Sequence, residues 1–203
     1  AASWRTILVM PERLRTDSGP GAVGVVVVTY HPTGDYARRL QQMAAQGAVM
    51  VVVDNGSTPE KRDALARLCR EQRWVFIPNA TNLGIAAALN QGMREVEAHG
   101  LGWALSFDQD SEPAAGFSEA LLTSCGQQPR PAAIAMVGVS HSDLSTGVRQ
   151  RILRPNPRCR LFFQKVSVAE TDLASVTMVI TSGCLTRVTA WRQLGGFDEA
   201  LFI

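Results

Sequence analysis

The sequence predicts an α/β fold in which a largely parallel sheet is flanked by helices. Three observations lead to this prediction: β-branched apolar runs recur along the chain, segments with helical spacing separate them, and polar residues follow the runs. Strands buried on both faces are typically continuous apolar runs, and their alternation with helices implies parallel strands joined by crossovers. The 203 residues, 46% of them hydrophobic, are enough for one large domain.

Residues 1–20 are expected to be a lead-in that ends in a cluster of turn formers, followed by one domain over residues 21–203 with halves at 21–111 and 112–203. Residues 141–170 hold further turn formers and a basic run, and no strand or helix is predicted there. Strands are predicted over residues 23–29, 48–53, 74–77, 102–107, 132–139 and 176–181. Helices are predicted over residues 33–46, from Thr58 with Pro59 in its first position, over about 15 residues from Ile85, over 114–125 and over 187–194.

Polar residues follow each of the first four predicted strands, at 29–32, 54–57, 79–84 and 108–110. The carboxyl ends of parallel strands share one edge of a sheet, where ligands of such folds bind. The last of these segments is Asp108-Gln109-Asp110. Two carboxylates separated by one residue can gather Mg²⁺ or Mn²⁺, hard cations that take oxygen ligands and often share them with phosphates. The four segments together therefore indicate a nucleotide and metal site.

Six segments, taken in order, resemble a family 2 glycosyltransferase, and the bacterial rhamnosyltransferase-like branch in particular. They are residues 25–32, 52–58, 82–92, 108–111, 180–185 and 194–199. The resemblance implies a GT-A (Rossmann-like) fold, with residues 21–111 as the nucleotide-sugar-binding half and 112–203 as the acceptor-side half. It implies transfer, with inversion, of a sugar such as rhamnose from a dTDP- or UDP-sugar to a glycan or lipid-linked saccharide in cell-wall or polysaccharide biosynthesis.

The resemblance also implies roles for individual residues. Asp54 would accept a hydrogen bond from the pyrimidine ring N–H, Asp108 would reach the ribose or the metal, and Asp110 would bind the metal directly. Ser182 and Gly183 would lie on the acceptor side. The expected nucleotide-sugar-binding residues are Thr29, Tyr30, Asp54, Asn82, Gly84, Asn90, Asp108 and Gln109.

The catalytic base of this branch follows the segment at 194–199, and this sequence stops at Ile203, so we expect a C-terminally truncated domain. Asp198 and Glu199 are the acidic residues left as candidates for the base, although the family uses them more often to brace the local turn. An alternative function is a nucleotide-sugar-binding module or inactive fragment without a base. An acidic residue shortly after Ile203 would favour the enzyme. A dinucleotide-dependent oxidoreductase is disfavoured because G-x-G-x-x-G is missing after the first strand.

Composition narrows the partners and the compartment. The net charge of +2 does not favour nucleic acid. The four cysteines show no C-x-x-C spacing and are expected to be free, buried thiols in a cytoplasmic protein. No apolar run approaches the roughly 20 residues that span a bilayer. A run of six cations is either a solvated loop or an electropositive rim for a lipid-linked acceptor or the inner membrane face. It comprises Arg149, Arg151, Arg154, Arg158, Arg160 and Lys165.

Overall fold

The computed structural model describes residues 5–9, 22–140, 152–156, 159–166, 174–175 and 179–200, with side chains in 22–139 and 179–200. The strands are β1 (Arg5–Val9), β2 (Val23–Thr29), β3 (Val49–Asp54), β4 (Val75–Pro78), β5 (Trp103–Asp108), β6 (Met136–Ser140), β7 (Ile152–Asn156), β8 (Cys159–Val166), β9 (Ala174–Ser175) and β10 (Cys184–Arg187). The α-helices are α1 (Tyr36–Ala44), α2 (Pro59–Gln72), α3 (Ile85–Ala98), α4 (Phe117–Gly126) and α5 (Val188–Leu194).

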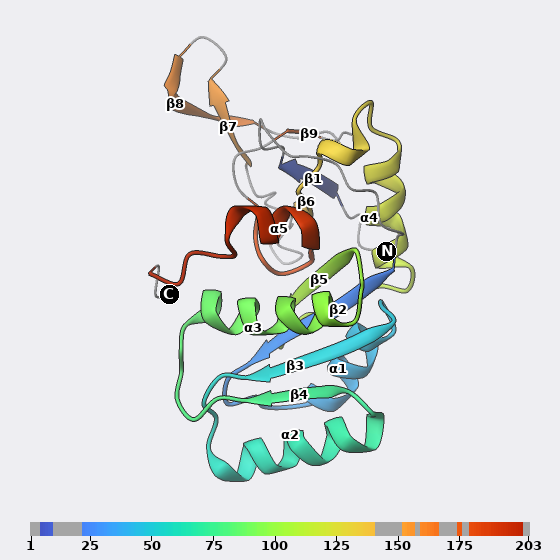
Figure 1. Cartoon of the computed structure of the whole chain (residues 1–203), viewed down its shortest axis with the longest axis vertical. Coiled ribbons are helices and arrows are strands. Elements are labelled where there is room, and N and C mark those ends of the chain that lie inside the picture. The colour runs from blue at the N-terminus through green and yellow to red at the C-terminus, as the bar shows by residue number, and fades with distance from the viewer. Residues whose placement is uncertain are drawn as a thin grey trace.

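One eight-stranded sheet, in the order β4-β3-β2-β5-β10-β6-β1-β9, runs through the molecule (Figure 1). Its first four strands are parallel, as the sequence predicts. Beyond β5 the sheet becomes mixed, because β10 is antiparallel to both β5 and β6. A separate hairpin pairs β7 with β8. The parallel half thus carries the predicted crossovers, and the second half extends the sheet by a different pairing.

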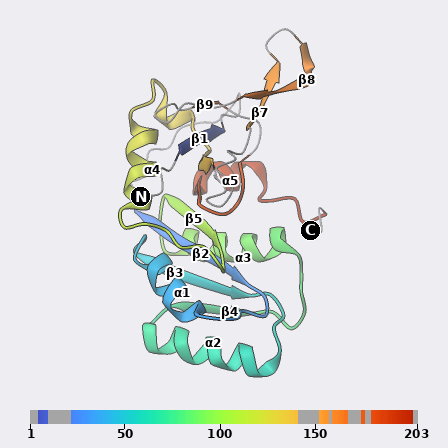
Figure 2. The same cartoon turned by 180° about the vertical axis from the view of Figure 1, so that it is seen from behind.

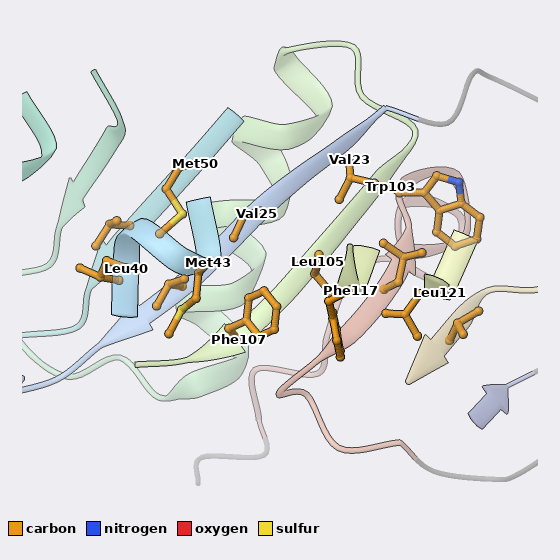
Figure 3. Packing of buried hydrophobic residues seen from close by; sticks show 14 of the residues in the cluster. Val23, Val25, Leu40, Met43, Met50, Trp103, Leu105, Phe107, Phe117 and Leu121 are labelled. Carbon is orange, nitrogen blue, oxygen red and sulfur yellow. The ribbon is translucent and has the colours of Figure 1, made fainter. Parts of the chain in front are cut away.

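Helices cover both faces of this sheet. Alternate residues of the strands belong to two hydrophobic clusters on opposite faces of the sheet. Val25 and Val27 lie in the cluster with α1, α2 and α4, whereas Val26 lies in the cluster with α3 and α5. Figures 1 and 2 show these two helical layers from opposite sides, and Figure 3 shows the packing of the first cluster. Full burial of one such side chain contributes roughly 1.5–3 kcal/mol. The apolar runs are therefore buried on both faces, as parallel-sheet strands are.

Four predicted segments need correction, and three of them are described first. Residues 5–9, assigned to the lead-in, form β1 and pair antiparallel with β6. The strand predicted over 132–139 begins only at Met136, because residues 131–133 form a 3-10 turn. Hairpin strands β7 and β8 lie where only turns and a basic run were predicted, and the side chains of that basic run lie outside the described residues.

The strand predicted over 176–181 is wrong for the part that the structure describes. Residues 179–183 are not in a strand, and β10 starts at Cys184 instead. Gly183 has φ +69°, a conformation that interrupts an extended chain and that glycine adopts without strain. Residues 176–178 lie outside the described residues. The strand is therefore displaced toward the C-terminus by a turn at residues 182–183.

Candidate functional site

The four parallel strands end side by side. In the sheet register Thr29 lies opposite Asp54, Asp54 opposite Pro78, and Val28 opposite Asp108. The loops that follow these strands therefore meet at one edge of the sheet. The sequence prediction that the four polar segments share an edge is confirmed.

Two cavities open at this edge. The Tyr30 cavity has a volume of about 350 Å³, and the Ser182 cavity about 380 Å³. The Tyr30 cavity is lined by Val28, Tyr30, Asn55, Asn82, Ile85, Asp108, Gln109 and Asp110. The Ser182 cavity is lined by Phe107, Asp108, Asp110, Ser111, Glu112, Pro113, Phe117, Val139, Ile180, Ser182 and Gly183. Asp108 and Asp110 belong to both, so the carboxylate pair lies where the two cavities join.

The charge of this lining is negative. Among the described residues that line the two cavities there are three carboxylates, at 108, 110 and 112, and neither a lysine nor an arginine. Glu112 is neutralised by Arg38, whose Nη2 lies 2.7 Å from Glu112 Oε1. Asp108 and Asp110 are exposed to the cavities. A phosphate-bearing ligand would therefore need a cation in order to bind beside them.

The donor set suits a hard divalent cation that is shared with a ligand. Within the described part of the chain, no three His, Cys, Asp or Glu side chains gather into a self-sufficient metal site. Asp108 and Asp110 supply two carboxylates, which is how Mg²⁺-type cations are often held, with phosphate and water oxygens completing the shell. The residues present therefore fit the predicted Mg²⁺ or Mn²⁺ site.

Hydroxyl groups brace the turn that carries these carboxylates. The Asp108 N–H donates to Ser182 Oγ at 3.2 Å, and Ser182 Oγ lies 2.7 Å from Ser111 Oγ. The Ser111 N–H closes the turn on the Asp108 carbonyl at 3.0 Å. Gly183 donates its N–H to the Ser106 carbonyl at 2.8 Å. Ser182 and Gly183, predicted to lie on the acceptor side, therefore hold the carboxylate turn from the far half of the chain.

The side chain of Gln109 points back to the loop that follows β2. Its Oε1 accepts the Tyr30 N–H at 2.9 Å, and its Nε2 donates to the Tyr30 carbonyl at 3.2 Å. The Tyr30 side chain stays exposed, and its ring centroid lies 4.2 Å from that of His31. Gln109 lines the cavity, but its amide is engaged with the protein backbone.

Thr29 and Asp54 lie beneath the cavity, fully buried. Asp54 Oδ1 accepts the Ser57 hydroxyl at 2.5 Å and the Thr29 hydroxyl at 3.2 Å, while Oδ2 accepts the Ser57 N–H at 3.2 Å. Ser57 Oγ in turn accepts the His31 N–H at 2.8 Å. The Asp54 carboxylate therefore ties the loops after β2 and β3 together.

Amide side chains that were not predicted to act together form a network at the part of the Tyr30 cavity lined by Asn55 and Asn82; Asn55 and Asn79 are buried, whereas Asn82 is exposed. Asn55 Nδ2 donates to Asn82 Oδ1 at 2.9 Å, and Asn55 Oδ1 accepts the Leu83 N–H at 3.0 Å. Asn82 Oδ1 also accepts the Gly84 N–H at 2.9 Å. Asn79 bonds both Asn55 and Gln91. The clustering of amide residues after β3 and β4 is the only sequence signal for this network.

Asn90, Asp198 and Glu199 line neither cavity. Asn90 is buried in α3 and bonds Trp191, Phe197 and Glu199. Asp198 accepts the N–H of Ala200 at 3.0 Å. Cys184 is also buried, and burial raises the pKa of its thiol to about 12, which disfavours a nucleophilic thiolate. Asn90, Asp198 and Glu199 thus make contacts within the protein, and their roles at the nucleotide or as the base stay predictions.

The sequence profile of "Glycosyl transferase family 2" matches residues 25–194. No curated protein sequence matches the chain. Within the described residues, no helix is long and apolar enough to cross a membrane.

Solved structures share the fold at low sequence identity. The structure of S. aureus TarS 1-349 aligns over 90% of this chain and 52% of its own, with 16% identity and a TM-score of 0.54. TarS 1-349 in complex with UDP aligns over 89% and 51%, with 14% identity and a TM-score of 0.51. A mannosyltransferase from Pyrobaculum calidifontis, solved with GDP-Man and Mn²⁺, aligns over 61% and 38%, with 22% identity and a TM-score of 0.45. The chain thus spans about half the length of TarS 1-349.

Proposed function

The chain belongs to glycosyl transferase family 2, and from that premise we propose that it binds a pyrimidine nucleoside diphosphate sugar for metal-dependent transfer. The donor would be a UDP- or dTDP-sugar, and the acceptor a glycan or lipid-linked saccharide. One observation carries this proposal: the Tyr30 and Ser182 cavities join at Asp108 and Asp110. A nucleoside in the first cavity and a sugar in the second would place the diphosphate at the carboxylate pair.

The Tyr30 cavity offers a platform for the nucleoside. The exposed Tyr30 ring can stack on a base, and Asn82 supplies amide atoms on the opposite wall. In this proposal Asp54 supports the nucleoside site by holding the loops around it, because its oxygens already accept hydrogen bonds from Thr29 and Ser57. Gly84 closes the loop above α3, with φ +83°. Asn90 is assigned to packing of the C-terminal segment and not to the nucleotide.

The Ser182 cavity would take the donor sugar. Its polar side carries Ser111, Ser182 and the carboxylates, and its other side carries Phe117 and Ile180. An apolar wall suits the methyl group of a 6-deoxyhexose, which supports a rhamnosyltransferase-like donor preference. A bound Mg²⁺ or Mn²⁺ would stabilise the negative charge that develops on the diphosphate leaving group.

Transfer with inversion also needs a base that takes the proton of the acceptor hydroxyl. Asp198 caps a local turn, and Glu199 is held by Asn90, so the catalytic base is assigned to neither. The proposal extends to a glycan or lipid-linked saccharide as the acceptor and to contact of the basic run with an anionic membrane surface.

Calorimetry with UDP, dTDP and GDP, with and without Mn²⁺, tests the proposal. We expect a pyrimidine diphosphate to bind at least tenfold more tightly with Mn²⁺, and Asp110→Asn to remove that gain, because one carboxylate ligand is lost. Asp63→Asn, on the exposed face of α2, is the matched control and should keep the gain. The proposal would be contradicted if Mn²⁺ left the nucleotide affinity unchanged, or if UDP, dTDP and GDP bound with equal affinity.

A turnover assay with the sugar nucleotide separates the enzyme from the alternative binding module. Transfer to a saccharide acceptor, or slow release of the sugar to water, supports the enzyme. Tight, Mn²⁺-dependent binding without release of sugar supports a nucleotide-sugar-binding module instead.

A further inference from the structure

Gln109, the residue between the two carboxylates, links the carboxylate turn to the loop that carries Tyr30. Its amide pairs with both backbone polar atoms of Tyr30, as a neighbouring strand would. Strands β2 and β5 already pair up to Val28 and Asp108. The Gln109 side chain therefore continues the pairing of β2 with β5 by one further step, where the backbone of residues 109–110 has turned away from the sheet.

Arg39 makes a second link between the same two loops. Its Nε donates to the Gln109 carbonyl at 3.3 Å, and its Nη2 donates to the Thr33 carbonyl at 2.8 Å. Both the backbone and the side chain of Gln109 are thus held against the loop that carries Tyr30. A displacement of the carboxylate turn would shift Gln109, and Gln109 would shift Tyr30.

We propose that Gln109 is a positioning residue that couples the nucleoside platform at Tyr30 to the metal-binding carboxylates Asp108 and Asp110. This inference rests on the proposed function, and it gives the middle residue of the carboxylate triplet a role other than ligand contact. Ordering of the carboxylate turn by a cation orders Tyr30 through the two amide hydrogen bonds. Stacking of a base on Tyr30 orders the carboxylates by the same path, since coupling between two sites is reciprocal.

A glutamine side chain suits this role for a chemical reason. It offers one acceptor and one donor, which match the N–H and C=O of a single backbone residue. Glutamate keeps the acceptor for the Tyr30 N–H but lacks the donor, and it adds a third negative charge beside Asp108 and Asp110. Methionine keeps the length and approximate volume without either hydrogen bond.

The test compares wild type, Gln109→Met and Gln109→Glu with the control Gln42→Met. Gln42 lies nearby on α1 and bonds Arg38, but it touches neither Tyr30 nor the carboxylates. Three quantities are measured: hydrogen exchange of residues 29–33 without ligand, the affinity for uridine, and the factor by which Mn²⁺ strengthens UDP binding. Uridine reports on the platform alone, because it carries no phosphate.

We expect Gln109→Met to speed exchange at Tyr30, to weaken uridine by about tenfold and to shrink the Mn²⁺ factor by a similar amount. Gln42→Met should match wild type in all three. Gln109→Glu should weaken uridine as well, because a carboxylate keeps the acceptor for the Tyr30 N–H but lacks the donor to the Tyr30 carbonyl. A role confined to local packing would leave the Mn²⁺ factor at the wild-type value, because cation binding and nucleoside binding would then be independent.

The inference is overturned if Gln109→Met leaves either the uridine affinity or the Mn²⁺ factor at the wild-type value. If wild type itself binds neither uridine nor UDP, the proposed function fails and the coupling fails with it. A wild type that binds both, with an unaffected Gln109→Met variant, contradicts the coupling alone. The exchange of residues 29–33 shows in each case whether the two hydrogen bonds hold Tyr30.

Discussion

The side-chain amide of Asn90 pairs with the backbone of Phe197: Oδ1 accepts the Phe197 N–H at 2.8 Å, and Nδ2 donates to its carbonyl at 2.9 Å. Asn90 also accepts the Trp191 indole N–H at 2.9 Å and donates to Glu199 Oε1 at 2.8 Å. Because Asn90 lies in α3 and Phe197 follows α5, these contacts join the two helices on one face of the sheet. The first residue of α3, Ile85, lines the Tyr30 cavity. The C-terminal segment is therefore attached to the same helix that contributes to this cavity.

Replacement of Asn90 by aspartate should destabilise the fold by about 2–4 kcal/mol at neutral pH, because the donors to Phe197 and Glu199 are lost and two carboxylates face each other. Urea unfolding at neutral pH measures the loss. Adding Glu199→Gln restores a donor opposite residue 90 and should recover part of the stability. If the stability losses of the two single variants simply add in the double variant, the contact is contradicted.

Gly196→Ala should be more destabilising than Gly195→Ala. Both glycines have positive φ, +95° and +85°, so both substitutions introduce backbone strain of about 1 kcal/mol. A Cβ at Gly196 would also lie 2.9 Å from Asn90 Oδ1, whereas a Cβ at Gly195 meets nothing within 4 Å. We expect an additional loss of about 1–2 kcal/mol for Gly196→Ala in thermal or urea unfolding. Equal losses would mean that residue 196 does not approach Asn90.

Gly56→Ala should weaken nucleotide binding as well as stability. A Cβ at this position would lie 2.5 Å from the Thr81 carbonyl carbon, so the loops after β3 and β4 would have to separate. Those loops carry Asn55 and Asn82, which line the Tyr30 cavity. We expect UDP affinity to fall about tenfold or more. Gly100→Ala, at φ +71° with nothing within 4 Å, is the strain control and should leave UDP affinity unchanged.

The Cys184 thiol should make stability depend on pH in the alkaline range. Burial raises its pKa from 9.0 to about 12, so the unfolded chain ionises first as the pH rises. Stability from this thiol is complete below pH 9 and is lost toward pH 12, with a slope of at most about 1.4 kcal/mol per pH unit. Urea unfolding from pH 8 to pH 10.5 should show a shallower decline for Cys184→Ala than for wild type. Parallel declines would refute this contribution.

The first half of the chain could be predicted because its signals are local. Each parallel strand is a continuous apolar run, and each helix has its own spacing and boundary residues. The meeting of residues 29, 54 and 108 at one edge then follows from the direction of the strands. The predicted fold class is confirmed by the structure and by its likeness to TarS 1-349.

The second half depends on contacts between residues distant in sequence. Strand β1 forms by pairing with β6, more than 120 residues later, and nothing near Arg5–Val9 marks that partner. The start of β10 is set by the turn at Gly183 and by hydroxyl contacts of Ser182 to β5. The sequence shows that residues 90 and 109 carry amides, but it does not show that these amides pair with the backbone of Phe197 and Tyr30.

Mn²⁺ binding followed by electron paramagnetic resonance, with UDP present, tests the central claim most directly. In the proposed site Asp108 and Asp110 hold the cation together with the diphosphate, so wild type and Asp63→Asn should take up Mn²⁺ only when UDP is added. Asp110→Asn should weaken that uptake at least tenfold, because one of two protein carboxylates is lost. UDP-dependent Mn²⁺ binding that persists unchanged in Asp110→Asn would contradict the assignment of the site.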